Sequence, residues 1–269
     1  MTVGTSWVPR SVDVSRPCAA RMYDYLLGGG HNFAVDRELG ERVATALPGA
    51  RDVARLNRAF LRRAVLALAG CGIRQFLDIG TGIPTVGNVH DIAQQADPGA
   101  RIVYVDNEPV AVAHSRLMLD GNDRAAAVEA DLRDPSSILD APATRELIDF
   151  DQPLGLLMVG VLHFVHDVED PQGVLARYRE VLAPGSHLAL SHCTSDSRPT
   201  EMAAMAEVMK RGKDPMYTRS HADVTALFDG FELLEPGVVA TPLWRPASPD
   251  DRHDGPERDQ IYAGVGVKR

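Results

Sequence analysis

The sequence predicts an α/β fold built on a doubly wound, mostly parallel sheet, and three observations support this prediction. Short apolar runs alternate with helical patterns between residues 75 and 192. Three aspartates at the ends of successive runs, Asp78, Asp106 and Asp131, are 28 and then 25 residues apart, which suits a strand followed by its crossover helix. The run Leu154–Leu162 contains only apolar residues and glycine, as expected of a parallel strand buried on both faces.

Seven strands are predicted, five of them parallel. The first, Gln75–Ile79, ends at a turn that contains Gly80 and Gly82. The other parallel strands are expected at Arg101–Asp106, Ala126–Ala130, Leu154–Leu162 and His187–Ser191. Two runs near the end of the chain, 231–234 and 261–267, predict a C-terminal antiparallel hairpin, and a polar, proline-rich loop over residues 242–256 joins them.

Helical spacing of apolar residues predicts the helices. Two of them precede the first strand, at residues 19–27 and 53–67, and the second carries several arginines away from its apolar face. We expect an N-terminal helical extension (residues 1–70) packed on a single core domain (residues 71–269). Helices within or after the sheet region are predicted at 86–96, 109–119 and 200–211.

The composition excludes several classes of function. Aspartate plus glutamate number 37 and lysine plus arginine 28, for a net charge of −9, which disfavours nucleic acid as a partner. The most apolar run is shorter than the roughly 20 residues of a membrane-spanning helix, and the N-terminus lacks the apolar core of a secretory signal. The cysteines Cys18, Cys71 and Cys193 have no CxxC spacing. We therefore expect a cytoplasmic protein that does not bind membranes.

Residues at the ends of the first two strands predict a nucleoside site. Gly80 and Gly82 allow a tight turn and a close approach of a ligand to the backbone. Asp106 ends the next strand, where its carboxylate can accept hydrogen bonds from both hydroxyls of a ribose. A dinucleotide pattern would need a third glycine, but Thr85 occupies that position.

The segment Asp78-Ile79-Gly80-Thr81-Gly82 resembles motif I of the class I S-adenosylmethionine-dependent methyltransferases. Pro84 replaces the last glycine of that motif, at a position near a helix start where proline costs little. The resemblance continues in Asp106-Asn107, in Asp131-Leu132, in the V-L-H-F segment 161–164 and in the L-x-P-G turn 182–185. It implies a Rossmann-like methyltransferase fold with S-adenosyl-L-methionine as cofactor, bound by Asp78, Gly80, Thr81, Gly82, Asp106, Asn107, Asp131, Leu132 and Gly160.

Segments outside the central motifs narrow the resemblance. They are similar to a bacterial S-adenosyl methyltransferase family long catalogued as a domain of unknown function, and the likeness covers nearly the whole chain. This resemblance implies no particular acceptor substrate. The segments are residues 21–29, 36–38, 77–85, 230–236 and 242–246.

His163 is the candidate general base, because it follows the strand end expected to face the transferred methyl group. The alternative is a histidine that packs below the cofactor or bonds to the backbone. His166 completes an H-x-x-H pair, but no third ligand has suitable spacing, so we expect no metal. His192, at the end of the fifth strand, is a second candidate for the site.

The N-terminal segment supplies candidates for substrate contact. Arg21 and Tyr23 lie in a helix that can cover the cofactor as a lid, with the glycines 28–30 as its hinge. A helix docked on the sheet edge is the alternative. Trp244, in the proline-rich loop, is a candidate for binding an aromatic or anionic substrate or for fixing the loop. The stripe Met202, Met205 and Met209 is more typical of core than of a pocket. It follows the fifth strand, however, where the resemblance implies that small-molecule methyltransferases place substrate-binding insertions.

Together these patterns predict methyl transfer to a small-molecule acceptor. The N/D-P-P-Y/F segment of enzymes that methylate base amines or glutamine amides is absent, since residues 161–164 are V-L-H-F. Three alternatives remain: a non-catalytic S-adenosylmethionine-binding regulator, a methyltransferase with a peptide acceptor and, less favoured because the third glycine is missing, an NAD-dependent dehydrogenase.

Overall fold

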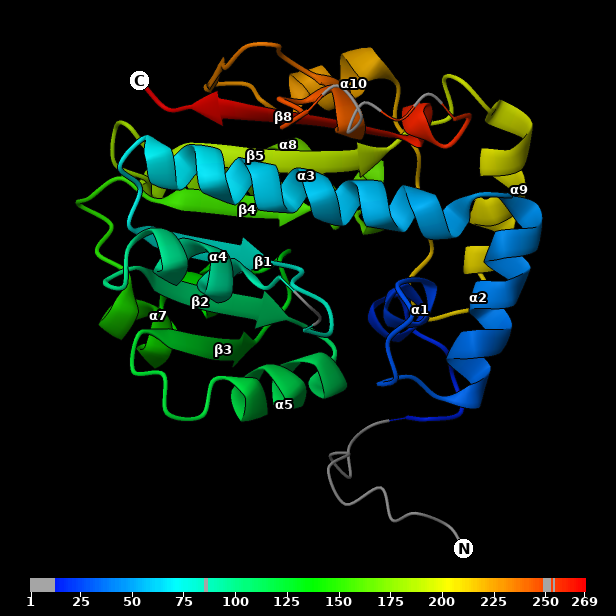
Figure 1. Cartoon of the computed structure of the whole chain (residues 1–269), viewed down its shortest axis with the longest axis horizontal. Helices are drawn as coiled ribbons and strands as arrows, with labels where there is room; N and C mark the ends of the chain where they lie inside the picture. Colours follow the sequence, from blue (N-terminus) through cyan, green and yellow to red (C-terminus); the bar gives the residue numbers. More distant parts are fainter. Residues whose placement is uncertain (1–12, 85–86, 249–252, 254) are drawn as a thin grey trace, which may run out of the picture.

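The computed structural model describes residues 13–84, 87–248, 253 and 255–269. Within these residues the strands form one eight-stranded sheet, in the order β3-β2-β1-β4-β5-β8-β6, with β7 also paired to β8. The first five strands are parallel and β8 runs antiparallel to β5 (Figure 1), which confirms the predicted fold class. The strands are β1 (Gln75–Ile79), β2 (Arg101–Asp106), β3 (Ala125–Glu129), β4 (Gly155–Val159), β5 (His187–Cys193), β6 (Glu232–Leu233), β7 (Val239–Ala240) and β8 (Ile261–Val267).

Two features of the sheet differ from the sequence prediction. The strand expected to reach Leu162 ends at Val159, because Gly160 adopts a left-handed conformation (φ 74°) and the 3-10 turn η1 (Leu162–Phe164) follows. The expected hairpin is more elaborate, since both β6 and the two-residue β7 pair with β8. A strand of two residues is too short to show an alternating pattern in the sequence.

Ten α-helices lie within the described residues, and no range was predicted for α2, α6, α7, α8 or α10. The sequence of α2 contains Gly40, which normally weakens a helix. A Cβ atom at that position would lie 2.6 Å from the Tyr25 ring, so the glycine permits α1 and α2 to pack closely. The helices are α1 (Ala19–Leu26), α2 (Ala34–Ala46), α3 (Ala50–Gly70), α4 (Val89–Ala96), α5 (Pro109–Met118), α6 (Pro135–Leu139), α7 (Pro142–Leu147), α8 (Pro171–Val181), α9 (Pro199–Met209) and α10 (His221–Ala226).

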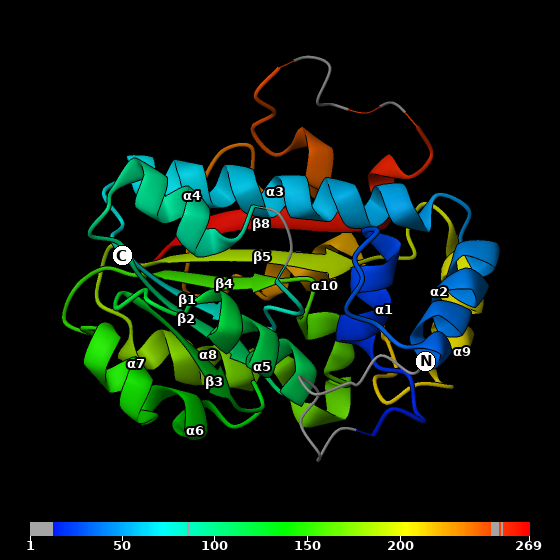
Figure 2. The same ribbon diagram turned by 60° about the horizontal axis from the view of Figure 1, so that its bottom comes forward.

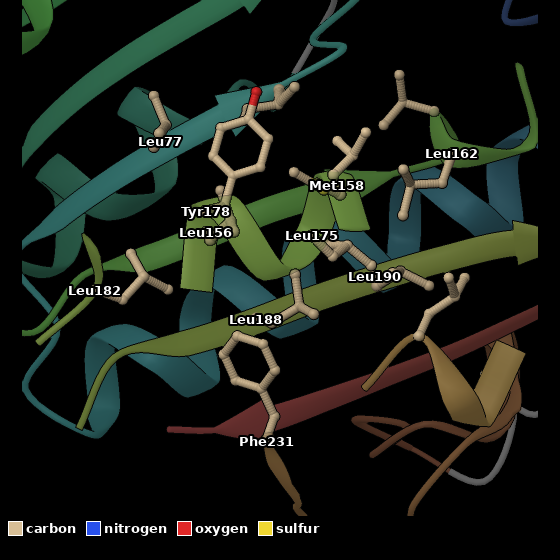
Figure 3. Packing of buried hydrophobic residues seen from close by; sticks show 14 of the residues in the cluster. Leu77, Leu156, Met158, Leu162, Leu175, Tyr178, Leu182, Leu188, Leu190 and Phe231 are labelled. Atoms are coloured by element: carbon tan, nitrogen blue, oxygen red, sulfur yellow. The ribbon is translucent and has the colours of Figure 1, made fainter. Parts of the chain in front are cut away.

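Helices cover both faces of the sheet. On one face, α8 and α10 pack on side chains such as Leu77, Leu156 and Leu188, with Tyr178 at the centre (Figure 3). On the other face, α3 and α4 pack on the alternate side chains of the same strands, among them Phe76. No helix of the described residues is long and apolar enough to cross a membrane.

A third apolar cluster lies beyond the carboxyl ends of the parallel strands. Helices α1, α2 and α9 gather there with the first turns of α3, which continues back over the sheet (Figures 1 and 2). Val53 and Ala54 of α3 belong to this cluster, whereas Phe60 and Ala64 belong to the sheet core. The division of the chain at residue 70 stays a prediction, and α3 contacts both parts.

Candidate active site

The turn after β1 has a backbone that only glycine accommodates well. Gly80 has φ 73°, and a Cβ atom there would lie 2.2 Å from a methyl carbon of Val161. Gly82 has φ 66° and its N–H donates to Oδ2 of Asp106 at 2.7 Å. The turn therefore joins the end of β1 directly to the end of β2. Thr85 lies outside the described residues.

Asp78 and Asp106 are buried carboxylates with few partners. Asp78 accepts a hydrogen bond from the Thr81 hydroxyl at 2.8 Å, and Asp106 accepts from the N–H groups of Gly82 and Glu108. Burial raises the pKa of each carboxyl to about 6, against the opposing effect of these hydrogen bonds. Such carboxylates favour a ligand that brings hydroxyl or ammonium donors.

Asp131 follows β3 and lies at a more exposed place. Arg133 donates from its guanidinium to both Asp131 oxygens and also binds Glu169 at 2.7 Å. Hydrogen bonds from Arg133, and one from Asn107, hold the pKa of Asp131 below its ordinary value. Leu132 lies between this ion pair and Tyr178, whose hydroxyl donates to the Leu132 carbonyl at 2.9 Å.

One cavity of about 800 Å³ joins these strand ends to the third apolar cluster. Its volume is within the range of roughly 300–1,000 Å³ typical of small-molecule sites. Every residue expected to bind the cofactor lines it, as do His163 and Tyr23. The cofactor candidates along its wall are Asp78, Gly80, Thr81, Gly82, Asp106, Asn107, Asp131, Leu132 and Gly160.

His163 lies in the 3-10 turn after β4 and is buried, 7% exposed. Its Nδ1 is buried without a hydrogen-bond partner among the described residues. Burial lowers the pKa of the imidazole well below its usual value, and the nearby His192 and Arg219 lower it further. The ring is thus neutral, and His163 lines the cavity.

Arg219 holds the turn that carries His163, although nothing in the sequence pattern singled it out. Its guanidinium donates to the carbonyls of Leu162 and Val165 and to Asp167. The Tyr217 N–H donates to the carbonyl of His163 itself at 2.8 Å. The loop after α9 therefore fixes the turn from outside.

Tyr23 lines the cavity with its hydroxyl already engaged. The hydroxyl donates to the Ala54 carbonyl at 3.0 Å and accepts from Asn57 Nδ2 at 3.2 Å, while Asn57 Oδ1 accepts from Ser191. Asn57 and Arg58 of α3 both line the cavity. The sequence interpretation missed them, because it treated the polar residues of this helix as a solvated face.

Three candidates from the sequence do not line the cavity. His192 is fully buried below it: its Nε2 accepts from Arg219 at 2.6 Å, its Nδ1 bonds to the Cys193 carbonyl, and burial lowers its pKa to about 4. Trp244 is fully buried behind α3, edge-on to Phe60, so it cannot contact substrate there. The predictions of direct contact are wrong for these side chains, since each is covered by its own packing layer.

Arg21, the third candidate, is a buried ion-pair centre instead of a wall residue. It contacts Asp36 at 2.8 Å and Glu108 at 2.6 Å, and also donates to the Arg16 carbonyl. Glu108 lines the cavity two residues after Asp106. Arg21 thereby ties α1 to the strand end that carries the predicted ribose carboxylate.

Comparison with known proteins decides the family. The model of the S-adenosyl methyltransferase family matches residues 5–269. The chain belongs to the S-adenosyl methyltransferase family. No curated protein matches it.

Two solved structures are similar over nearly their full length. A DUF574 family protein from Streptomyces avermitilis is 40% identical, with 96% of this chain and 99% of that chain covered and a TM-score of 0.92. A protein from Thermobifida fusca, provisionally named a methyltransferase, is 39% identical, with 98% and 100% covered and a TM-score of 0.93.

More distant structures share the fold alone. The N-methyltransferase NodS from Bradyrhizobium japonicum, in complex with S-adenosyl-L-homocysteine, is 12% identical, with 86% of this chain and 97% of that chain covered and a TM-score of 0.50. The family makes this protein an S-adenosylmethionine-dependent methyltransferase. Within the described residues, no group of three or more metal-ligating side chains gathers.

Proposed function

We propose that this S-adenosyl methyltransferase transfers the methyl group of S-adenosyl-L-methionine to a small molecule held in the 800 Å³ cavity. The observation that carries the proposal is the continuity of that cavity. The predicted nucleoside residues line one end, the third apolar cluster lines the other, and His163 lies on the same wall. Cofactor and acceptor can therefore meet without solvent between them.

The carboxylates at the strand ends fit an adenosyl ligand. Asp106 uses one lone pair of each oxygen for a backbone N–H, so each oxygen can accept one more hydrogen bond. Those two positions match the two hydroxyls of a ribose. Asp78 would hold the amino group of the methionine portion, and Asp131 with Leu132 would flank the adenine.

The cofactor supplies a methyl group on a sulfonium, whose thioether leaves readily. The chain then needs mainly to position the acceptor and exclude water. His163 is neutral and lines the cavity, so its ring would accept the hydrogen bond that orients the acceptor nucleophile. Tyr23 would shape the wall only, because Ala54 and Asn57 occupy its hydroxyl.

The N-terminal helices would serve as the cover of this site. Helix α1 is held at its start by Asp214, which accepts from the Ala19 N–H at 2.7 Å, and by the Arg21–Glu108 ion pair. Lys213 also contacts Glu108 at 3.2 Å. Opening the cover requires these contacts to separate, while the packing of the sheet stays intact.

Calorimetric titration tests the proposal directly. The purified protein is titrated with S-adenosylmethionine, S-adenosylhomocysteine and NAD, and the titrations are repeated with Asp106→Ala. We expect both adenosyl ligands to bind, NAD not to bind, and the variant to lose at least about tenfold in affinity. Asp123→Ala is the matched control, since Asp123 is exposed and outside the cavity.

Binding of NAD, or of no ligand, would contradict the proposal. Binding of S-adenosylmethionine without formation of S-adenosylhomocysteine, across a broad set of candidate acceptors, would favour the non-catalytic regulator instead.

A further inference from the structure

The apolar end of the cavity differs from ordinary hydrophobic core. The third cluster contains 15 buried hydrophobic residues, and all of them except Leu39 also line the cavity. An apolar void without an occupant destabilises a fold, because the side chains around it lose contacts. A ligand that fills this space explains why the cluster is hollow.

Methionines dominate the wall of this end. Met22, Met202, Met205, Met209 and Met216 line it, from α1, α9 and the loop after α9, and the whole chain has eight methionines. Methionine side chains are flexible and make favourable contacts between sulfur and aromatic rings. We refer to these five residues as the methionine wall.

Several charged side chains of the cavity are paired. Arg133 is bound to Asp131 and Glu169 near the predicted adenine position, and Lys213 is bound to Glu108 at the edge of α1. The five side chains of the methionine wall carry no charge themselves. An acceptor with a fixed charge would lose its hydration there without gaining a partner, which is costly.

His163 lies at the junction of the two ends of the cavity. Phe164 stacks edge-on against it with ring centroids 4.4 Å apart, and Phe164 itself lines the cavity. Tyr23, Asn57 and Ser191 bond in a chain to one another. A ligand at this junction would thus meet the His163 ring next to the apolar surface of the methionine wall.

We infer that the acceptor is an uncharged aromatic molecule with a hydroxyl as the methylated group, and that its rings lie against the methionine wall. This inference rests on the proposed function. In the reaction the hydroxyl oxygen forms the new O–CH₃ bond while the S–CH₃ bond breaks. The hydroxyl proton passes to a ring nitrogen of His163, and the electron pair of the broken bond remains on sulfur as a thioether.

Three probes of similar size test this inference on the native protein. With S-adenosylhomocysteine at saturation, the protein is titrated with 2-naphthol, with 2-naphthoate and with 2-naphthylmethylammonium. We expect 2-naphthol to bind at least roughly tenfold more tightly than either charged probe. Equal or tighter binding of a charged probe, or no binding of 2-naphthol, overturns the inference.

Variants of Met205 locate the binding site. Met205→Glu should weaken 2-naphthol binding at least roughly tenfold by placing a charge on the methionine wall. Met205→Leu, which conserves volume and apolarity, should leave it within about threefold. Unchanged binding in Met205→Glu overturns the inference. If that variant does not fold, as judged by circular dichroism, the three-probe comparison on the native protein still decides.

The titration with S-adenosylhomocysteine separates the two proposals. If S-adenosylhomocysteine binds and the protein does not prefer 2-naphthol to the charged probes, only the aromatic acceptor is rejected. If S-adenosylhomocysteine does not bind, the proposed function is itself rejected, and this inference with it.

Discussion

The sheet core and the third cluster are both apolar, but methionines are frequent only in the third cluster, and the two regions are held together differently. Around the sheet, leucine, valine and phenylalanine side chains from both layers fill the space (Figure 3). In the third cluster, apolar side chains line one end of the cavity of about 800 Å³. Apolar packing alone does not hold helices in place around a cavity. Polar contacts such as Arg21–Glu108 and Ala19–Asp214 therefore help to hold α1 in position.

The difference shows how one chain can combine a rigid scaffold with an accessible site. The scaffold presents aspartates at fixed strand ends, whereas the helices that close over them are attached by a small number of contacts. Those contacts can separate more easily than a filled core can open. Four measurements test this comparison.

The largest expected effect is that of Arg21→Met. The change keeps the apolar bulk of the side chain but leaves the buried carboxylates of Asp36 and Glu108 without their shared cation. We expect a loss of about 3–5 kcal/mol in the free energy of unfolding, measured by urea denaturation. Arg55→Met removes an exposed pair with Asp52 and should change it by less than about 1 kcal/mol. Equal losses in the two variants would show that the buried pair does not hold the helices.

Truncation of one side chain in each region compares filled and hollow packing. Leu156→Ala, in the sheet core, should reduce the free energy of unfolding by about 2–5 kcal/mol. Met205→Ala borders the existing cavity, so it loses fewer contacts, and we expect a loss of less than about 2 kcal/mol. Chemical denaturation of both variants provides the measurement. A larger loss for Met205→Ala would mean that its cluster is packed as tightly as the sheet core.

Asp78→Asn should stabilise the ligand-free protein, by about 1–2 kcal/mol at pH 8. Burial raises the folded-state pKa of Asp78 to about 6, above its ordinary value of 3.8. The ionised form therefore destabilises the fold above pH 6, and this penalty disappears as the pH falls from 6 towards 4. The Thr81 hydroxyl can reverse its hydrogen bond to suit asparagine.

Thermal unfolding of Asp78→Asn and the native protein at pH 8 and pH 4 measures this effect. The difference in Tm should vanish at pH 4. The same variant should bind S-adenosylmethionine more weakly. The native aspartate would then strengthen cofactor binding at a cost in folding stability. A gain that is equal at both pH values would exclude ionisation as its cause.

The smallest expected effect is a spectroscopic one at His163, between the two regions. Its pKa lies well below 6.5 because of burial and the nearby His192 and Arg219. The ring nitrogens should keep the chemical shifts of a neutral imidazole between pH 8 and pH 6 in nitrogen-15 NMR spectra. His163→Gln identifies the resonances by their loss. A midpoint at or above pH 6.5 would contradict the buried, neutral state.

Local patterns in the sequence were sufficient to predict the parallel sheet and the residues that follow β1 and β2. Gly80 and Asp106 are placed by the ends of β1 and β2, and parallel strands bring their carboxyl ends to one edge whatever the surrounding helices do. The same reasoning could not place β4 correctly, because the left-handed Gly160 ends a run that remains apolar up to Leu162. It also missed several helices, among them α2, whose packing against Tyr25 depends on a glycine that disfavours helix locally.

The sequence by itself determined the α/β class, the succession of parallel strands along the chain and the residues that follow β1 and β2. These features depend on short-range periodicity and on the chemistry of turns. The tertiary structure decided which other side chains share the cavity. It buried His192 and Trp244 in separate layers, brought Asn57 and Arg58 to the wall, and arranged five methionines around a hollow cluster. The reason is physical: the direction of a helical side chain depends on how that helix packs, and packing joins residues far apart in the chain.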